Sequence, residues 1–217
     1  MCRDIYPSPS RFVTKDRRNS VQAAERAFKA RGGILRTAEA IRAGVHPRTL
    51  YQMRDDGILE RLERGLYRLA NLPPLSQPDL TTVAAKIPSG VICFVTALSF
   101  HGMTTQIPRA VDVALLRGSS RPRIHHPPIR VYYFSPLPFR EGIEVHEIDS
   151  VAVRVFSREK TLADCFKYRR KLGMDIVLEA LGLYTRSGRT DMSSLSYYAR
   201  VCRVEKIMRP YLETILQ

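Results

Sequence analysis

The residues best suited to chemistry are basic, hydroxyl and amide side chains between positions 36 and 64. A guanidinium group can form a forked pair of hydrogen bonds with guanine, and a glutamine amide can do the same with adenine. Arginine, threonine and tyrosine also bind phosphate oxygens, which positions a protein on DNA without reading its sequence. We therefore expect this segment to contact double-stranded DNA. The expected contacts are Arg36, Thr37, His46, Arg48, Thr49, Tyr51, Gln52, Arg54, Arg61 and Arg64.

The carboxylate of Asp112, on an expected strand, suggests a different chemistry, that of a magnesium-dependent nucleotidyltransferase. Such sites commonly take two acids at alternate positions of one strand, and here the alternate position is Ala114. The Gly-Ser-Ser run over 118–120 also follows the strand instead of preceding it. A nuclease that combines Asp112 with Glu144 or Glu147 is a further alternative. We favour a protein that is not an enzyme and that takes no cofactor and no metal.

Two short helices joined by a glycine turn are expected to hold the DNA-binding side chains. Thr37 is the expected N-cap of the first helix, and Gly44 follows its last turn, where a left-handed residue reverses the chain. Pro47 suits the first turn of the second helix, because its missing N–H would be unpaired there anyway. Leu50 and Met53 share one face of that helix, so we expect them to be buried. This is the spacing of many helix-turn-helix units.

A two-stranded hairpin is expected directly after the second helix. Residues 58–59 and 66–69 alternate as short strands, and residues 63–65 join them. Arg61 and Arg64 then lie at or near the hairpin tip. With a supporting helix over 21–30, the pattern predicts a winged helix-turn-helix, although plain helical hairpins share part of it.

The charge balance indicates a polyanionic partner. The 217 residues carry 35 Lys+Arg against 21 Asp+Glu, for a formal charge of +14. Arginine makes up 28 of the 35 basic residues, which suits phosphate and guanine but is also what a GC-rich genome produces. Residues 1–75 carry 15 basic and 8 acidic residues, so positive charge is densest in the segment with the two helices.

Several protein classes are disfavoured by the composition. The first residues lack the apolar core of a signal peptide, and no apolar run is long enough to cross a membrane. The four cysteines are scattered, without the paired spacing of a zinc site. We therefore expect a cytoplasmic protein that has no membrane partner.

A proline-rich stretch divides the chain into parts. We expect a flexible basic arm over 1–19, a winged helix-turn-helix domain over 20–72, a linker over 73–78, and a C-terminal α+β domain over 79–217. In the last part a small sheet is flanked by helices, so the whole chain is of the α+β class. The expected elements of this part are helices over 79–87, 91–101, 174–184 and from 158, two more helices after 194, and strands over 110–116, 129–134, 143–148 and 151–156.

Three short motifs carry a resemblance to a known family. They are ERGLYR over 63–68, VTALSFHG over 95–102, and VFSREKTLADCF over 155–166. In this order and spacing the chain resembles the AbiEi antitoxins of the AbiE type toxin–antitoxin and phage-defence systems. The resemblance covers about residues 21–185, and the region after it matches no known pattern.

The resemblance implies a winged-helix DNA-binding domain followed by an antitoxin domain. Members of the family bind inverted-repeat operators upstream of their own operon and repress it. They also counteract a neighbouring toxin that resembles a nucleotidyltransferase, without a stable complex. We accordingly expect an autoregulating antitoxin that is a monomer or weak dimer, with a stand-alone transcriptional regulator as the alternative.

The motif residues of the C-terminal part also have a structural interpretation. His101 is placed to bond a last carbonyl of its own helix, and Thr161 and Asp164 lie near a helix start, where such residues form caps. We favour structural roles for these residues over catalytic ones.

Overall fold

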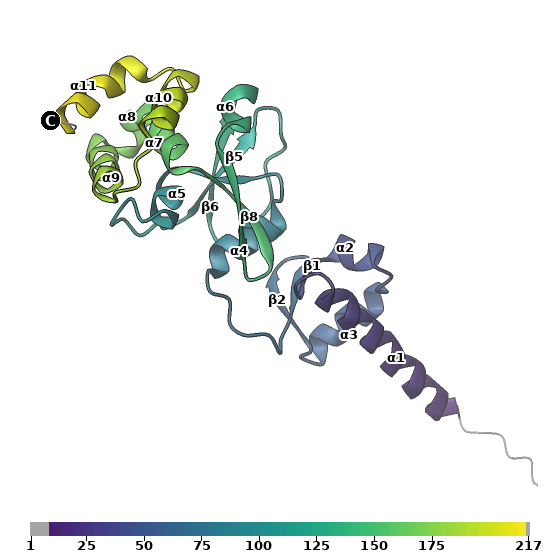
Figure 1. Cartoon of the computed structure of the whole chain (residues 1–217). Coiled ribbons are helices and arrows are strands. Elements are labelled where there is room, and N and C mark those ends of the chain that lie inside the picture. The colour runs from purple at the N-terminus through teal and green to yellow at the C-terminus, as the bar shows by residue number, and fades with distance from the viewer. Residues whose placement is uncertain (1–8, 216–217) are drawn as a thin grey trace, which may run out of the picture. The chain divides into compact units, whose positions relative to one another are not determined.

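The computed structural model describes the backbone of residues 9–215 and the side chains of residues 17–213. It is a mixed α+β structure with two sheets and falls into two compact units, residues 1–76 with 149–151, and the remainder (Figure 1). The predicted α+β class is confirmed at this level. No described helix is long and apolar enough to cross a membrane.

From residue 9 onward, unit 1 is built from three helices and a three-stranded antiparallel sheet in the order β1-β3-β2. Its core is formed by apolar side chains from all of these elements, Phe28, Leu50 and Met53 being fully buried. The elements are α1 Pro9–Lys29, β1 Ile34–Arg36, α2 Thr37–Arg42, α3 Pro47–Asp55, β2 Leu59–Glu63 and β3 Leu66–Leu69.

Unit 1 differs from the sequence prediction in three places. Helix α1 begins at Pro9, so residues 9–19 are helical where a flexible arm is expected; residues 1–8 lie outside the described part. Strand β1 is absent from the prediction, because three residues are too few for a periodic pattern and the strand exists only by pairing with β3. The N-cap of α2 is Arg36 and not Thr37: the backbone N–H of Arg36 donates to Oε2 of Glu39 at 2.9 Å.

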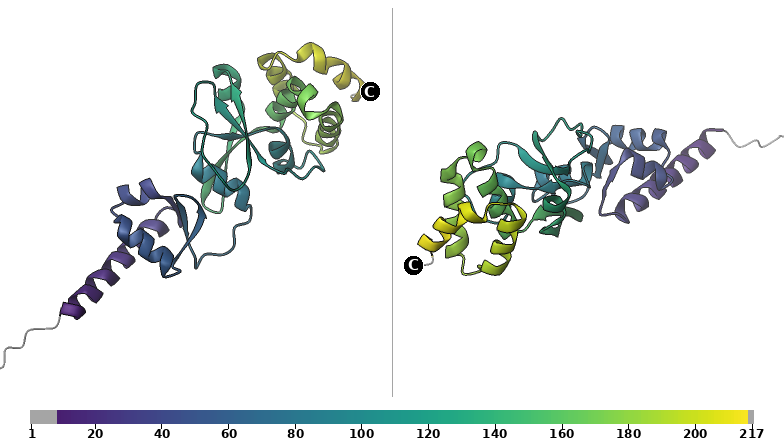
Figure 2. Two further views of the ribbon diagram at one scale, coloured as in Figure 1. Left: turned by 180° about the vertical axis from the view of Figure 1, so that it is seen from behind. Right: turned by 90° about the horizontal axis from the view of Figure 1, so that it is seen from above.

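Unit 2 holds a five-stranded sheet in the order β6-β5-β4-β8-β7. Strand β4 is antiparallel to β5 and parallel to β8, and β5 is parallel to β6. The helices from α7 to α11 gather at one side of this sheet (Figure 2). The elements are α4 Pro78–Lys86, β4 Val91–Ile92, α5 Phe94–Phe100, β5 Val111–Leu116, β6 Ile129–Phe134, α6 Pro136–Arg140, β7 Ile143–Ile148, β8 Val151–Phe156, α7 Arg158–Lys167, α8 Arg169–Leu172, α9 Met174–Arg186, α10 Met192–Val201 and α11 Glu205–Ile215.

The four strands expected in unit 2 are present, and one expected helix is wrong at its start. Val91 and Ile92 form strand β4 in the middle of the sheet instead of opening a helix over 91–101. Two consecutive β-branched residues favour the pleated conformation, and here each is buried against neighbouring strands. Helix α5 begins only after Cys93.

Candidate nucleic-acid interface

Helix α3 is fixed at its start by a cap and at its inner face by packing. Nδ1 of His46 accepts a hydrogen bond from the backbone N–H of Arg48 at 3.2 Å, and Pro47 follows as the first helical residue. Before this cap, Gly44 has a φ of 86°, a conformation that glycine adopts without steric cost. Leu50 and Met53 are fully buried, as predicted, so the residues between them face away from the core.

The predicted DNA-binding side chains on the outward face of α3 differ in their exposure to solvent. Arg48 and Tyr51 are exposed, and Thr49 and Gln52 are half-buried. The guanidinium of Arg48 makes no hydrogen bond or ion pair with any residue that the structure describes. It therefore keeps all five of its N–H donors for a partner.

The last turn of α3 is different, because acids engage its basic and amide side chains. Nε and NH2 of Arg54 donate to Oδ1 of Asp55 at 2.9 and 2.7 Å, and the same guanidinium lies 5.4 Å from the ring centroid of Tyr51. Nε2 of Gln52 donates to Oδ1 of Asp56 at 2.8 Å. Asp56 also accepts from Arg17 of α1 at 3.2 Å. These side-chain bonds of Asp55 and Asp56 are not among the sequence predictions, although the spacing of Gln52 and Asp56 by four residues is a signal for such a pair.

Arg36 and Thr37 lie where α2 meets the hairpin, and both are half-buried. NH2 of Arg36 donates to Oε1 of Glu39 at 2.6 Å, and this hydrogen bond raises the pKa of the Arg36 guanidinium. The backbone N–H of Thr37 donates to the carbonyl of Gly65 at 2.9 Å. These two residues therefore join α2 to the hairpin turn and are less available than Arg48.

The hairpin of β2 and β3 presents two arginines at its end. Its register shifts between Arg61 and Glu63, and Gly65 turns the chain with a φ of 74°. Arg61 and Arg64 are both exposed. Behind them, the nearly buried Arg68 donates to the carboxylate of Glu60 across the strands. The hairpin thus has an ion pair across the strands at its base and two exposed arginines near its turn.

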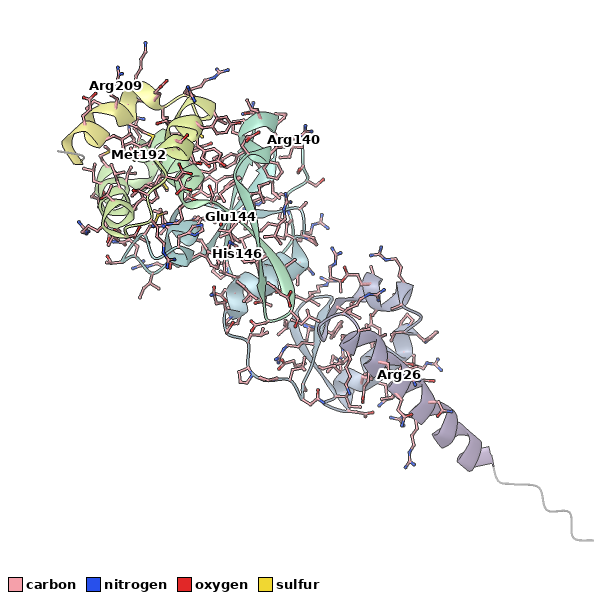
Figure 3. All side chains as sticks on the ribbon, viewed as in Figure 1. Arg26, Arg140, Glu144, His146, Met192 and Arg209 are labelled. Atoms are coloured by element: carbon pink, nitrogen blue, oxygen red, sulfur yellow. The ribbon has the colours of Figure 1, made fainter. Side chains whose placement is uncertain are left out.

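Basic side chains also lie on α1, where Arg26 is exposed (Figure 3). Arg17 and Arg18, nearer the start of the helix, are exposed as well. A cavity of about 420 Å³ lies between this part of α1 and the segment after α3, and it is lined by Arg17, Arg18, Val21, Gln22, Asp56 and Ile58.

The two family-like motifs of unit 2 meet inside the fold. Nε2 of His101, after α5, lies 2.7 Å from the carbonyl oxygen of Phe156, at the end of β8. The hydroxyl of Thr161 donates to the same oxygen at 3.2 Å. Our expectation that His101 bonds a carbonyl of its own helix is wrong, because the ring reaches across to a strand. Its position is set by a contact between elements, which spacing along the chain does not reveal.

Helix α7 carries a buried ion pair. Lys160 and Asp164 are 0% and 1% exposed, and Nζ of Lys160 donates to Oδ2 of Asp164. Sγ of Cys202 donates to the other carboxylate oxygen at 3.2 Å, and Nζ lies 4.1 Å from the ring centroid of Phe156. Burial raises the pKa of the Asp164 carboxyl, against the opposing effect of Lys160. The groups that pair here therefore stabilise each other's charge within the core.

Asp112 is fully buried and is held by its neighbours on the sheet. Its register partner Arg130 donates to both carboxylate oxygens, at 2.7 and 3.1 Å, and the backbone N–H of Thr96 donates at 3.3 Å. Burial raises the pKa of Asp112, and the bonds from Arg130 oppose that rise.

The acids that a nuclease would combine with Asp112 lie elsewhere on the sheet. Glu144 and Glu147 are exposed on β7, where Glu144 accepts from Nε2 of His146 at 3.1 Å (Figure 3). Strands β4 and β8 separate β7 from β5, which places these acids at least about 14 Å from Asp112 at the usual strand spacing. No group of three or more His, Cys, Asp or Glu among the described residues could hold a metal ion. The geometry gives no support to the pairing of Asp112 with either glutamate.

Comparison with known proteins finds a family match within the first unit. Residues 22–70 match the sequence model of a family described as transcriptional regulator, AbiEi antitoxin. The AbiEi resemblance is confirmed for this segment, which contains the first of the three motifs. The AbiEi segment takes in the second part of α1 together with β1, α2, α3 and the hairpin. The crystal structure of the RV2827C protein from Mycobacterium tuberculosis is similar at 13% identity and a TM-score of 0.46, over 87% of this chain and 78% of that one. No curated protein matches the chain.

Proposed function

We propose that this AbiEi-type chain is a sequence-specific regulator whose first unit is a winged helix-turn-helix. Helix α3 enters the major groove of duplex DNA, and the hairpin of β2 and β3 is the wing. Arg48, Thr49 and Gln52 reach base edges, while Tyr51, Arg54 and His46 contact phosphates or the groove wall. Arg36 and Thr37 contribute at the start of α2.

The observation that carries the proposal is the division of α3 into two faces. Leu50 and Met53 bury one face in the core of unit 1, and Arg48 stands on the other with no partner among the described residues. An unpaired arginine on an exposed helix of a chain with formal charge +14 is suited to a polyanion. The match of this same segment to AbiEi regulators supports the choice of DNA.

The wing supplies binding that does not depend on sequence. Arg61 and Arg64 extend from a short hairpin whose base is braced by the pair Arg68–Glu60. Such contacts neutralise phosphates and release counterions, so their contribution falls as salt rises. Base contacts from α3 then determine which sequence is held.

The resemblance to AbiEi antitoxins extends the proposal to a biological role. The chain represses its own operon from an inverted-repeat operator, which takes two copies as a weak dimer or as two monomers on DNA. It also counteracts a nucleotidyltransferase-like toxin encoded beside it. Unit 2, which carries the two buried motifs, is the antitoxin part.

Binding to the chain's own upstream DNA tests the proposal. Fluorescence anisotropy would compare that fragment, labelled, with a shuffled fragment of the same composition, in buffer that contains EDTA. We expect tighter binding to the upstream fragment, by about 10³-fold or more, and no effect of EDTA. Equal binding to both fragments would contradict sequence-specific regulation. Co-expression with the neighbouring reading frame separates the antitoxin from the stand-alone regulator, since only the antitoxin rescues growth.

A further inference from the structure

Asp56 connects two helices at the end of the proposed recognition helix. Its Oδ1 accepts from Nε2 of Gln52, one turn earlier in α3, at 2.8 Å, and its Oδ2 accepts from NH2 of Arg17 in α1 at 3.2 Å. The two carboxylate oxygens thus accept hydrogen bonds from side chains of two different helices. Asp56 is the C-cap residue of α3, and the chain turns immediately afterwards.

The position of this acid is electrostatically unfavourable on two counts. The C-terminal end of a helix carries partial negative charge, so an anion there is disfavoured. The helix is also the part of the chain that we assign to a polyanion, where an additional negative charge opposes binding. The surface bond to Arg17 offers little in return, because side chains that are 55% and 40% exposed pair weakly. Apart from the small contribution of the i,i+4 bond with Gln52, the stability of the fold therefore gains little from Asp56.

The bond to Gln52 gives a reason of another kind. A free glutamine side chain samples many rotamers, and it loses this conformational entropy when its amide pairs with a base. Because Asp56 occupies one N–H of the Gln52 amide, the other N–H and the carbonyl oxygen remain in a fixed orientation. Those two groups are the ones that a forked pair with adenine requires. Arg17 holds the far side of the same carboxylate, which restricts Asp56 in turn.

We infer that Asp56 is a positioning residue that fixes Gln52 for base reading and so sets the base preference at one position of the operator. This inference rests on the proposed function, since it assigns Gln52 to a base edge. In the complex, Asp56 lowers affinity for DNA of any sequence through its charge and raises discrimination through Gln52. Asp55 next to it differs, because its bonds go to Arg54, whose proposed partner is phosphate.

The neighbouring acids provide a matched pair of variants. Asp55→Ala and Asp56→Ala remove the same charge from adjacent positions at the end of α3, and only the second frees Gln52. Asp56→Asn removes the charge but keeps an oxygen that can accept from Gln52. Gln52→Ala and the double variant with Asp56→Ala complete a double-mutant cycle. Far-UV circular dichroism and thermal unfolding would establish that each full-length variant is folded.

The experiment selects duplexes from a random pool with each full-length variant and reads the base preference at every position by sequencing. We expect Gln52→Ala and Asp56→Ala to flatten the preference at the same single position, about 5- to 10-fold, and the double variant to add nothing further. Asp56→Asn should retain most of that preference, and Asp55→Ala all of it. All three acid variants should bind random DNA about 2- to 5-fold more tightly at low salt, because each removes a negative charge.

The possible outcomes distinguish a failure of the positioning role of Asp56 from a failure of the proposed DNA recognition. If the wild-type chain enriches no motif, the proposed function fails. If it enriches a motif that Asp56→Ala leaves unchanged, or that Asp55→Ala alters equally, the positioning role of Asp56 is overturned while DNA recognition stands. A motif that Gln52→Ala does not alter also overturns the inference, because Gln52 then reads no base.

Discussion

The imidazole of His101 and the carbonyl of Phe156, 55 residues apart in sequence, are joined at 2.7 Å in unit 2. This contact ties the end of α5 to the end of β8, and Thr161 at the start of α7 bonds the same oxygen. Three elements therefore share one carbonyl group. His101 of the VTALSFHG motif and Thr161 of the VFSREKTLADCF motif meet there, which gives these two residues a structural role.

Replacing His101 by alanine should destabilise the fold. Removing the ring leaves a carbonyl with one bond fewer in a mostly buried place, at a cost of about 1–3 kcal/mol in the free energy of unfolding. Equilibrium urea unfolding followed by far-UV circular dichroism would measure it. His125→Ala is the control, because this histidine is exposed on the segment between β5 and β6. An equal loss in both variants would argue against a specific role for the His101 contact.

The same histidine should make stability depend on pH. Burial lowers the pKa of His101 below its ordinary value of 6.5. The unfolded chain then takes up a proton at a higher pH than the folded chain. The contribution of His101 to the free energy of unfolding is therefore fully present above about pH 6.5 and is lost as the pH falls through the folded-state pKa. The free energies of unfolding of the wild type and His101→Gln, measured between pH 8 and 5, should converge as the pH falls. A constant difference across that range would show that His101 has the same pKa in both states.

The buried pair on α7 should be sensitive to the loss of one partner and tolerant of the loss of both. Asp164→Ala leaves the ammonium group of Lys160 unpaired in the core, which should cost about 3–5 kcal/mol of unfolding free energy. The double variant Lys160→Met and Asp164→Leu removes both charges and should lose less than about 2 kcal/mol. Urea midpoints for the two proteins would test this ordering. If the double variant proved the less stable of the two, the pair would be a net source of stability.

The hairpin tip should contribute affinity without selectivity. Arg64→Ala should weaken binding to upstream and shuffled DNA by the same factor and lower the slope of log K against log salt by about 1. Anisotropy titrations at several salt concentrations would give both quantities. A loss confined to the upstream fragment would instead assign Arg64 to a base edge.

The turns and faces of unit 1 could be predicted from the sequence because they depend on local chemistry. Gly44, Pro47 and the buried pair Leu50 and Met53 act through backbone preference and helical spacing. Strands β1 and β4 could not be found in this way, since three and two residues form strands only when partners lie beside them. The start of α1 at Pro9 was also missed, because polar residues gave that stretch no apolar face to follow.

In the candidate site, too, the positions of the residues could be predicted from the sequence and their side-chain partners could not. The sequence located the residues of α3 and the hairpin, including the exposure of Arg48, Tyr51, Arg61 and Arg64. It did not reveal that Arg36 is held by Glu39 or that Arg54 is held by Asp55. Side-chain partners at short range depend on rotamers, and charge counting treats every arginine as equally free.

The measurement that tests the central claim most directly is the affinity of Arg48→Ala for the upstream DNA, with Arg31→Ala, an exposed arginine outside the two helices, as the charge-matched control. If α3 reads the major groove, Arg48→Ala should lower specific affinity by about 1–3 kcal/mol and relax the preference at one base. Arg31→Ala should show a small loss that is the same for upstream and shuffled DNA. Unchanged affinity and an unchanged footprint for Arg48→Ala would contradict the assignment of α3 as the recognition helix.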